Sequence, residues 1–308
     1  MPNIEEQNLT EFLLEVKAKM ANISTSQNNE INDINQYVLN NSGKFIRSKI
    51  IYLYGLEIGV KKPKLVELAS AAELIHLSTL IHDDIIDEAD LRRDMPTVVK
   101  KWGIKKAILY GDFLYTKTFQ GLNSLENTDI ADVLINCAEA LIEGEFNQLK
   151  IKDSSTFSMA EYFDVIEKKT AVLFSGVLKC LGIEAKLPAD YINDLEQLGL
   201  SFGRAFQIND DLSDFEDSKT TGKAKFKDLA EGKLTLPMIF LLGSLQEAEQ
   251  IKILKIIESG KFLRIKQVLE SSGSFEKARH ERQVAINHCI EYTCLLYTSD
   301  AADDVISV

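Results

Sequence analysis

Residues that break helices and residues that form covalent or metal cross-links are both scarce in this chain. Its 308 residues include five prolines, 16 glycines and four cysteines, and no Cys-x-x-Cys spacing occurs. Few breakers leave room for long regular elements. Cysteines without ligand spacing exclude a typical structural zinc site or a disulfide scaffold, and we expect reduced thiols in a cytoplasmic protein.

Basic charge and long apolar runs are lacking too. The chain has 35 Lys and Arg against 47 Asp and Glu, a net charge of −12. Such a balance gives no general attraction to nucleic acid or to anionic lipid. The longest apolar stretch, residues 234–245, is interrupted by Pro237, and residues 1–7 carry two glutamates and no apolar signal region. We therefore predict no nucleic-acid partner, no signal peptide and no integral membrane segment.

Apolar residues recur at spacings of three and four, which predicts an all-α protein. No linker rich in Gly, Ser or Pro divides the chain, so we predict one domain over residues 1–293, and we interpret residues 294–308, which resemble a translated DNA-library adapter, as a non-native tail. Loops are expected at 91–97 and 217–233. The expected helices are 5–21, 30–40, 43–58, 63–90, 104–126, 128–151, 157–182, 188–216, 234–258, 261–271 and 275–293.

Two of the most apolar helices each carry an aspartate-rich motif. Carboxylates about 4 Å apart repel by roughly 4 kcal/mol at an effective dielectric near 20, so clusters on buried helices call for cations. Mg²⁺ suits them because it keeps part of its water shell and bridges to phosphate. One motif alone is equally typical of a solvated helix face, whereas two copies favour metal binding. The motifs are LIHDDIID, with Asp83, Asp84 and Asp87, and QINDDLSD, with Asp210, Asp211 and Asp214.

Isolated basic residues accompany both motifs. Guanidinium groups beside carboxylate-bound metal suit phosphate oxygens. Lys44 and Arg47 are expected on one helical face. Lys169, Lys223 and Lys233, each taken alone, are more typical of a surface lysine. The sequence has no glycine-rich nucleotide loop, no HExxH and no GxSxG. A His-Asp phosphohydrolase would explain His82 and Asp83 but not the second motif. The basic candidates are Lys44, Arg47, His76, Arg92, Arg93, Lys169, Lys223 and Lys233.

The chain resembles the trans-isoprenyl diphosphate synthases, or polyprenyl synthetases. It is similar to the medium- and long-chain type that includes octaprenyl diphosphate synthases, and the shared motifs occur in the same order. The match runs through GKFIR, the first aspartate motif with its LRR, EGEFNQ, KKTAVLF, the second motif and GKLTLP. The resemblance implies a single bundle of antiparallel helices around a deep central cavity, and a homodimer. It also implies Mg²⁺-dependent head-to-tail condensation of isopentenyl diphosphate with an allylic diphosphate such as farnesyl diphosphate.

The resemblance also assigns roles residue by residue. Three Mg²⁺ ions, for which Mn²⁺ can substitute, would bind the six motif aspartates, of which Asp83, Asp84, Asp87 and Asp210 also count as catalytic. The allylic diphosphate would be held by Arg92, Lys169 and Lys233, and isopentenyl diphosphate by Lys44, Arg47, His76 and Arg93. Lys223 is a further substrate-binding candidate. Thr170 and Gln207 would shield and orient the carbocation.

Small side chains precede the first motif and bear on product length. Ser78 and Thr79 lie where short-chain relatives place aromatic residues, so we expect an open path and a product longer than fifteen carbons, a quinone side-chain precursor. Asp94 replaces the usual glycine after the arginine pair, and Asn209 replaces an aliphatic residue. Two alternatives are a class I terpene cyclase, which would not need the second diphosphate pocket, and a non-catalytic regulatory subunit, which should have eroded motifs.

Overall fold

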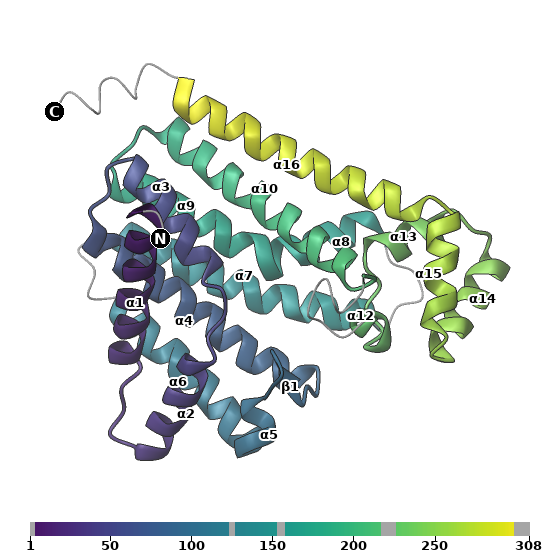
Figure 1. The fold of residues 1–308 in the computed structure, drawn as a ribbon, viewed down its shortest axis with the longest axis horizontal. Coiled ribbons are helices and arrows are strands. Elements are labelled where there is room, and N and C mark those ends of the chain that lie inside the picture. Colours follow the sequence, from purple (N-terminus) through teal and green to yellow (C-terminus); the bar gives the residue numbers. More distant parts are fainter. Residues whose placement is uncertain (1–3, 123–126, 153–157, 217–225, 299–308) are drawn as a thin grey trace. The chain divides into compact units, whose positions relative to one another are not determined.

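The computed structural model describes residues 4–122, 127–152, 158–216 and 226–298, and helices account for most of them (Figure 1). The all-α prediction is confirmed. The two short strands among these residues, β1 (Leu91–Arg92) and β2 (Met95–Pro96), pair antiparallel. The helices are α1 (Ile4–Ile23), α2 (Asn29–Asn40), α3 (Ile46–Glu57), α4 (Lys62–Ile86), α5 (Val98–Trp102), α6 (Ile104–Leu122), α7 (Thr128–Lys152), α8 (Met159–Ile166), the π-helix η1 (Glu167–Ala171), α9 (Val172–Glu184), α10 (Ala189–Ser213), α12 (Lys227–Ala230), α13 (Leu236–Gly243), α14 (Glu247–Glu258), α15 (Phe262–Ser271) and α16 (Ser274–Thr298).

The chain forms two compact units. The first unit comprises Met1–Glu139 and Leu173–Glu196, and the second comprises Ala140–Val172 and Gln197–Val308. The single domain predicted for residues 1–293 stays a prediction. All four cysteines are free, as expected, and Cys137 and Cys180 are buried.

In the first unit, α4 is the central helix and packs against α1, α3 and α6. Pro63 lies in its first turn, where a missing backbone N–H costs nothing. Leu65, Leu74 and Ile75 are fully buried. This helix is long and apolar enough to cross a membrane, but 67% of its most apolar window is buried inside the protein, as in a core helix. In the second unit, α13 packs against α16 and α15 around a separate apolar cluster.

The first aspartate motif ends α4 earlier than predicted. The helix stops at Ile86, not at residue 90, because Glu88 has a left-handed φ of 50°. Arg93 and Asp94, with φ of 54° and 62°, form the two-residue turn between β1 and β2. Two successive left-handed residues define a type I′ turn, and the short polar side chain of aspartate tolerates that conformation. Asp94 is therefore compatible with a position usually occupied by glycine.

Three other predicted helices also differ from the structure. The helix predicted at 157–182 contains the π-turn η1, and the helix predicted at 234–258 is broken after Gly243, because the capping box of Gln246 and Glu249 starts α14. The helix predicted to end at 293 continues to Thr298. Two short helices were not predicted: α5, which precedes the helix expected at 104–126, and α12, which lies inside the loop expected at 217–233.

Candidate active site

The first aspartate motif lies at the C-terminal end of α4. Asp84 is 3% exposed, and its Oδ1 accepts hydrogen bonds from Nε and Nη2 of Arg92, both at 2.8 Å. Asp83 and Asp87 are half-buried. Because α4 ends at Ile86, the chain turns before β1, and Arg92 on β1 reaches back to the helix end that the chain has just left. The structure thus places the first arginine of the pair directly beside the first aspartate motif.

Basic groups converge beside this motif within the first unit. Arg47 is buried on α3, with its Cζ 4.5 Å from the ring centre of Phe174, and burial lowers its pKa to about 10. Burial, followed by the positive charges of Arg47, Arg92 and Arg93, lowers the pKa of His76 well below its ordinary value. His76 is therefore neutral at pH 7, and three guanidinium groups share its surroundings. The buried Nε of Arg47 has no hydrogen-bond partner among the described residues.

The second arginine, which lies in the hairpin turn, packs against a glycine. A Cβ added to Gly43 would lie 2.2 Å from Nη2 of Arg93, so a larger residue there would displace the guanidinium. Nη1 of Arg93 donates to the carbonyl of Asn41 at 3.3 Å. Lys44, by contrast, is exposed and precedes α3, because Phe45 takes a left-handed φ of 51° at the helix start. The prediction that Lys44 and Arg47 share one helical face is wrong.

In the second unit, the second motif ends α10. Asp211 is 4% exposed, and its two oxygens accept hydrogen bonds from the Tyr162 hydroxyl at 2.7 Å and from Nε2 of Gln207 at 2.8 Å. Burial, then the negative charge of Asp228, raises the pKa of Asp211 to about 7. Asp210 is half-buried.

The last aspartate of this motif shapes the chain that follows it. Asp214 is 6% exposed and accepts hydrogen bonds from the backbone N–H of Lys227 at 2.8 Å and of Asp228 at 3.3 Å. Its carboxylate thus orders the start of α12 and brings Asp228 toward Asp211. Lys223 lies outside the described residues.

The π-turn η1 positions the lysine and threonine of KKTAVLF. Oγ1 of Thr170 donates to Oε1 of Gln207 at 2.7 Å. Lys169 pairs with Glu145 and with Gln148 of α7. Lys233 pairs with Glu231 at 2.8 Å. Both predicted lysines are thus mostly buried and ion-paired rather than ordinary surface lysines.

The two predicted chain-length residues are both hydrogen-bonded. Ser78 is fully buried and donates to the carbonyl of Gly111 on α6 at 2.7 Å, while Thr79 is half-buried and donates to the carbonyl of His76 at 2.7 Å. Their role in product length stays a prediction.

The donor set of the motifs suits a hard divalent cation, since it consists of carboxylate oxygens without histidine or cysteine. Asp210 and Asp228 both raise the pKa of Asp211, which shows that negative charge is crowded there. Among the described residues, no group of three His, Cys, Asp or Glu side chains is already gathered for a metal ion. The residues therefore fit Mg²⁺ that completes its coordination with water and phosphate oxygens.

Two residues of this region were missed by sequence reasoning. Tyr162 is 49 positions from its partner Asp211, and Asp228 follows a loop after the motif, so neither has helical spacing to it. The partners of Lys169, by contrast, were indicated by the sequence. Glu145 and Gln148 both belong to the EGEFNQ segment, which is part of the family resemblance.

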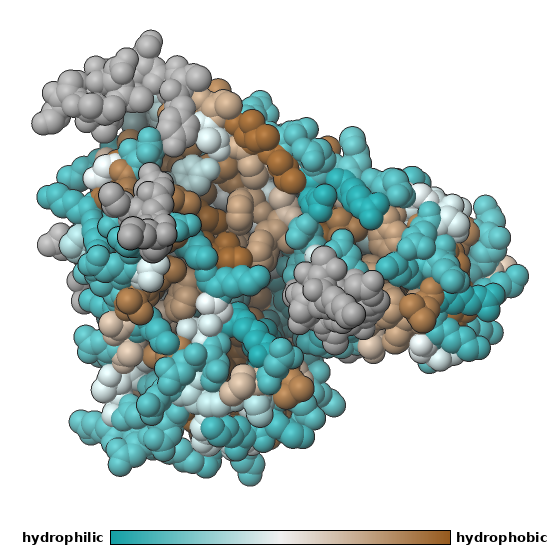
Figure 2. All heavy atoms as spheres, viewed as in Figure 1, coloured by the Kyte–Doolittle hydropathy of each residue, from teal (hydrophilic) through white to brown (hydrophobic). Residues whose placement is uncertain are grey.

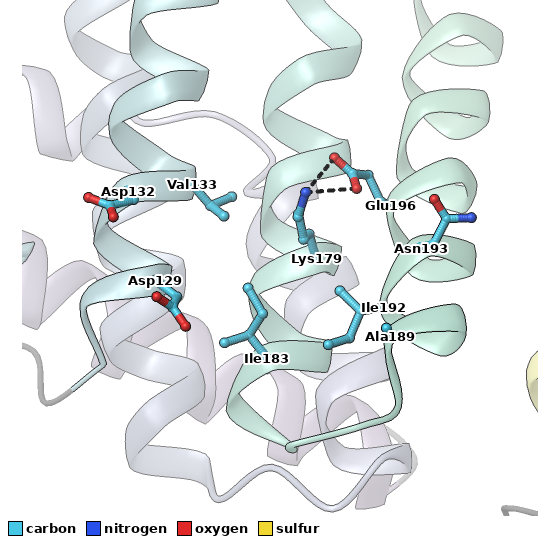
Figure 3. A pocket seen from close by; sticks show the side chains of 9 residues that line it. All are labelled: Asp129, Asp132, Val133, Lys179, Ile183, Ala189, Ile192, Asn193 and Glu196. Atoms are coloured by element: carbon cyan, nitrogen blue, oxygen red, sulfur yellow. Dashed lines mark hydrogen bonds and ion pairs between the residues drawn. The ribbon is translucent and has the colours of Figure 1, made fainter.

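A pocket of about 470 Å³ in the first unit contains none of the predicted residues (Figure 3). It is lined by α7, α9 and α10, and the ion pair of Lys179 with Glu196, at 2.9 Å, lies on its wall. On the face drawn in Figure 2, hydrophilic residues predominate and apolar ones appear in smaller groups.

The fold and the two motifs define an all-α enzyme of the isoprenoid synthase class. The family model described as "Polyprenyl synthetase" matches residues 28–272, and the chain belongs to this family of trans-isoprenyl diphosphate synthases, which are prenyl transferases. It is 34% identical over 258 residues to an octaprenyl diphosphate synthase of Escherichia coli, covering 83% of this chain and 80% of the relative. It is 32% identical over 293 residues to a geranylgeranyl diphosphate synthase of Saccharolobus solfataricus, covering 92% and 87%.

Among solved structures, a decaprenyl diphosphate synthase from Rhodobacter capsulatus superimposes with a TM-score of 0.87 at 29% identity, covering 97% of each chain. The prenyl synthase interpretation is thus confirmed at the level of family and fold. These relatives do not favour a terpene cyclase or a regulatory subunit.

Proposed function

We propose that this protein condenses isopentenyl diphosphate with an allylic diphosphate such as farnesyl diphosphate, and releases a trans-polyprenyl diphosphate longer than fifteen carbons that serves as a quinone side-chain precursor. One observation carries the proposal most directly. Within the first unit, a carboxylate motif suited to metal adjoins Arg47, Arg92 and Arg93, whose charges all act on His76. Carboxylates for Mg²⁺ next to guanidinium groups for phosphate are complementary to a metal-bound diphosphate.

The isopentenyl diphosphate would be held by Arg47, His76 and Arg93, with Lys44 at the exposed edge. The unpartnered Nε of Arg47 supports this assignment, because a buried guanidinium donor without an acceptor favours an anionic ligand. A neutral His76 donates one N–H without adding charge.

The six motif aspartates divide by burial into two sets. Asp83, Asp87 and Asp210 are half-buried and would contact Mg²⁺ directly. The other three are each engaged by protein donors and would orient the first three: Asp84 by Arg92, Asp211 by Tyr162 and Gln207, and Asp214 by the backbone of α12. When bound, Mg²⁺ withdraws electron density from the leaving diphosphate.

The chain's own residues would then support ionisation and coupling. Arg92, Lys169 and Lys233, with Lys223, would share the negative charge that develops as the allylic C–O bond breaks and its electron pair leaves with the diphosphate. The double bond of isopentenyl diphosphate, held in place, attacks the carbocation, and a proton is lost to the departing diphosphate. Thr170 and Gln207 present oxygen atoms that stabilise the cation, and exclusion of water prevents its quenching.

The decisive experiment incubates purified protein with farnesyl diphosphate, labelled isopentenyl diphosphate and Mg²⁺, and sizes the lipid products. Asp83→Ala and Asp210→Ala should lose product formation, whereas Asp132→Ala, an exposed carboxylate in the pocket of Figure 3, should retain it. No Mg²⁺-dependent elongation by the unaltered protein would contradict the proposal. Conversion of farnesyl diphosphate without isopentenyl diphosphate would indicate a cyclase.

We also propose a homodimer in the cytoplasm. On α6, Ile104, Ile108 and Leu109 are 53%, 43% and 67% exposed, and neighbouring large apolar side chains on one helix favour coverage by a second copy. Light scattering should give twice the chain mass, and Leu109→Glu should shift it toward the monomer. A monomeric mass for the unaltered protein would exclude the dimer.

A further inference from the structure

Four side chains of the second unit form one continuous hydrogen-bonded chain. The Tyr162 hydroxyl donates to Oδ2 of Asp211 at 2.7 Å, and Oδ1 of Asp211 accepts from Nε2 of Gln207 at 2.8 Å. Oε1 of Gln207 in turn accepts from Oγ1 of Thr170 at 2.7 Å. This hydrogen-bonded chain joins α8, α10 and η1. It ends on Thr170, which is proposed to face the carbocation.

The direction of each bond follows from the ionised form of Asp211, the form that binds a metal. An ionised carboxylate only accepts hydrogen bonds, so Gln207 turns its NH₂ group to Asp211. Its carbonyl oxygen therefore faces Thr170, and the threonine hydroxyl must donate to it. Once its single proton is committed, Thr170 can offer only lone pairs to a neighbouring substrate, and lone pairs are what a carbocation attracts.

The tyrosine hydroxyl holds the far end of this arrangement. Tyr162 and Asp211 are 3% and 4% exposed, so water does not readily replace the hydroxyl. Without it, one oxygen of Asp211 loses its donor and the carboxylate is free to rotate. Gln207 can then turn its amide over and present NH₂ to Thr170, which reverses the polarity at the reacting end.

We propose that Tyr162 is a positioning residue of the reaction: through Asp211 and Gln207 it keeps the Thr170 hydroxyl oriented with its lone pairs toward the allylic cation. The proposal rests on the proposed function and deepens it, since it assigns a catalytic purpose to a buried tyrosine remote in sequence from both aspartate motifs. Tyr162 touches no substrate and acts only through the chain.

The test compares two buried tyrosines. Tyr110 in the first unit is 2% exposed and donates its hydroxyl to Oδ1 of Asn35 at 2.7 Å, so Tyr110→Phe removes an equivalent bond outside the chain. Tyr162→Phe should lower kcat roughly tenfold to a hundredfold and leave KM for both diphosphates within about twofold, because orientation and not binding is lost. Tyr110→Phe should lose as much thermal stability as Tyr162→Phe, yet keep kcat within about twofold of the unaltered protein.

A double-mutant cycle separates positioning from general destabilisation. Thr170→Val removes the hydroxyl at the other end of the chain, so Tyr162→Phe should lower kcat little further in that background, whereas independent effects would multiply. Equal kcat in Tyr162→Phe and Tyr110→Phe, or multiplicative losses in the cycle, would overturn the proposal. If Tyr162→Phe does not fold, Tyr162→Met carries the test, with the same fall in kcat and the same unchanged KM expected.

A measurement without substrate distinguishes this proposal from the proposed function. In protein labelled with ¹⁵N-glutamine, the side-chain amide signals of Gln207, identified by their absence in Gln207→Met, should shift in Tyr162→Phe and not in Tyr110→Phe. If they shift while the unaltered enzyme elongates no prenyl chain, the hydrogen-bonded chain stands and the proposed function fails. Unshifted signals in a folded variant would refute the role of Tyr162 by themselves.

Discussion

The close contact at Gly203 allows a quantitative prediction. This glycine lies on α10 one turn before Gln207, and a Cβ built on it would lie 2.3 Å from Cα of Ala171, the last residue of η1. Ordinary contact begins at 3.4 Å, so Gly203→Ala must move η1 and α10 apart by about 1 Å. The bond from Thr170 to Gln207, now 2.7 Å, would then exceed hydrogen-bonding distance.

Gly203→Ala should lower the catalytic rate more than it lowers the stability of the fold. Overpacking by one methyl group costs about 1–3 kcal/mol, and the better helix propensity of alanine returns about 1 kcal/mol. A displacement of about 1 Å at a reacting group, by contrast, can lower kcat roughly a hundredfold. Gly203→Ala should therefore fold and bind both substrates, yet turn over slowly.

The assay measures kcat, KM and thermal unfolding together. Gly243→Ala is the matched control, because no atom lies within 4 Å of the added Cβ on α13. It should be unchanged or stabilised by up to about 1 kcal/mol, with full activity. A Gly203→Ala enzyme with kcat within about twofold of the unaltered protein would refute the reasoning, since the contact would then not position Thr170.

Three further perturbations test other parts of the site. Ser78→Phe should shorten the product, detected by chromatography, and destabilise the fold because the ring meets Gly111; unchanged length in folded protein would exclude the proposed path. His76 stays neutral when folded and binds a proton when unfolded, so the free energy of unfolding should fall as the pH drops from 7.5 to 5.5, and should fall less in His76→Gln; equal pH slopes in urea titrations would contradict this. Lysine in Arg92→Lys cannot reproduce both contacts to Asp84. The free energy of unfolding in the same titrations should fall by about 1 kcal/mol, and KM for the allylic diphosphate should rise. Unchanged values would show that the second contact is dispensable.

The sequence by itself determined the features that depend on local spacing. Periodic apolar residues specify helices. Both aspartate motifs and the KKTAVLF segment could be recognised because their members lie within a turn or two of one another. The family resemblance rests on those same short motifs, and it could therefore be recognised from the sequence too.

Only the tertiary structure decided which partners these residues have. It ended α4 at Ile86 so that Arg92 reaches back to Asp84, placed Lys44 before the helix of Arg47, and placed the Tyr162 hydroxyl against Asp211. The physical reason is that burial and hydrogen-bond geometry depend on how helices pack against each other, and residues distant along the chain leave no periodic signal of that packing.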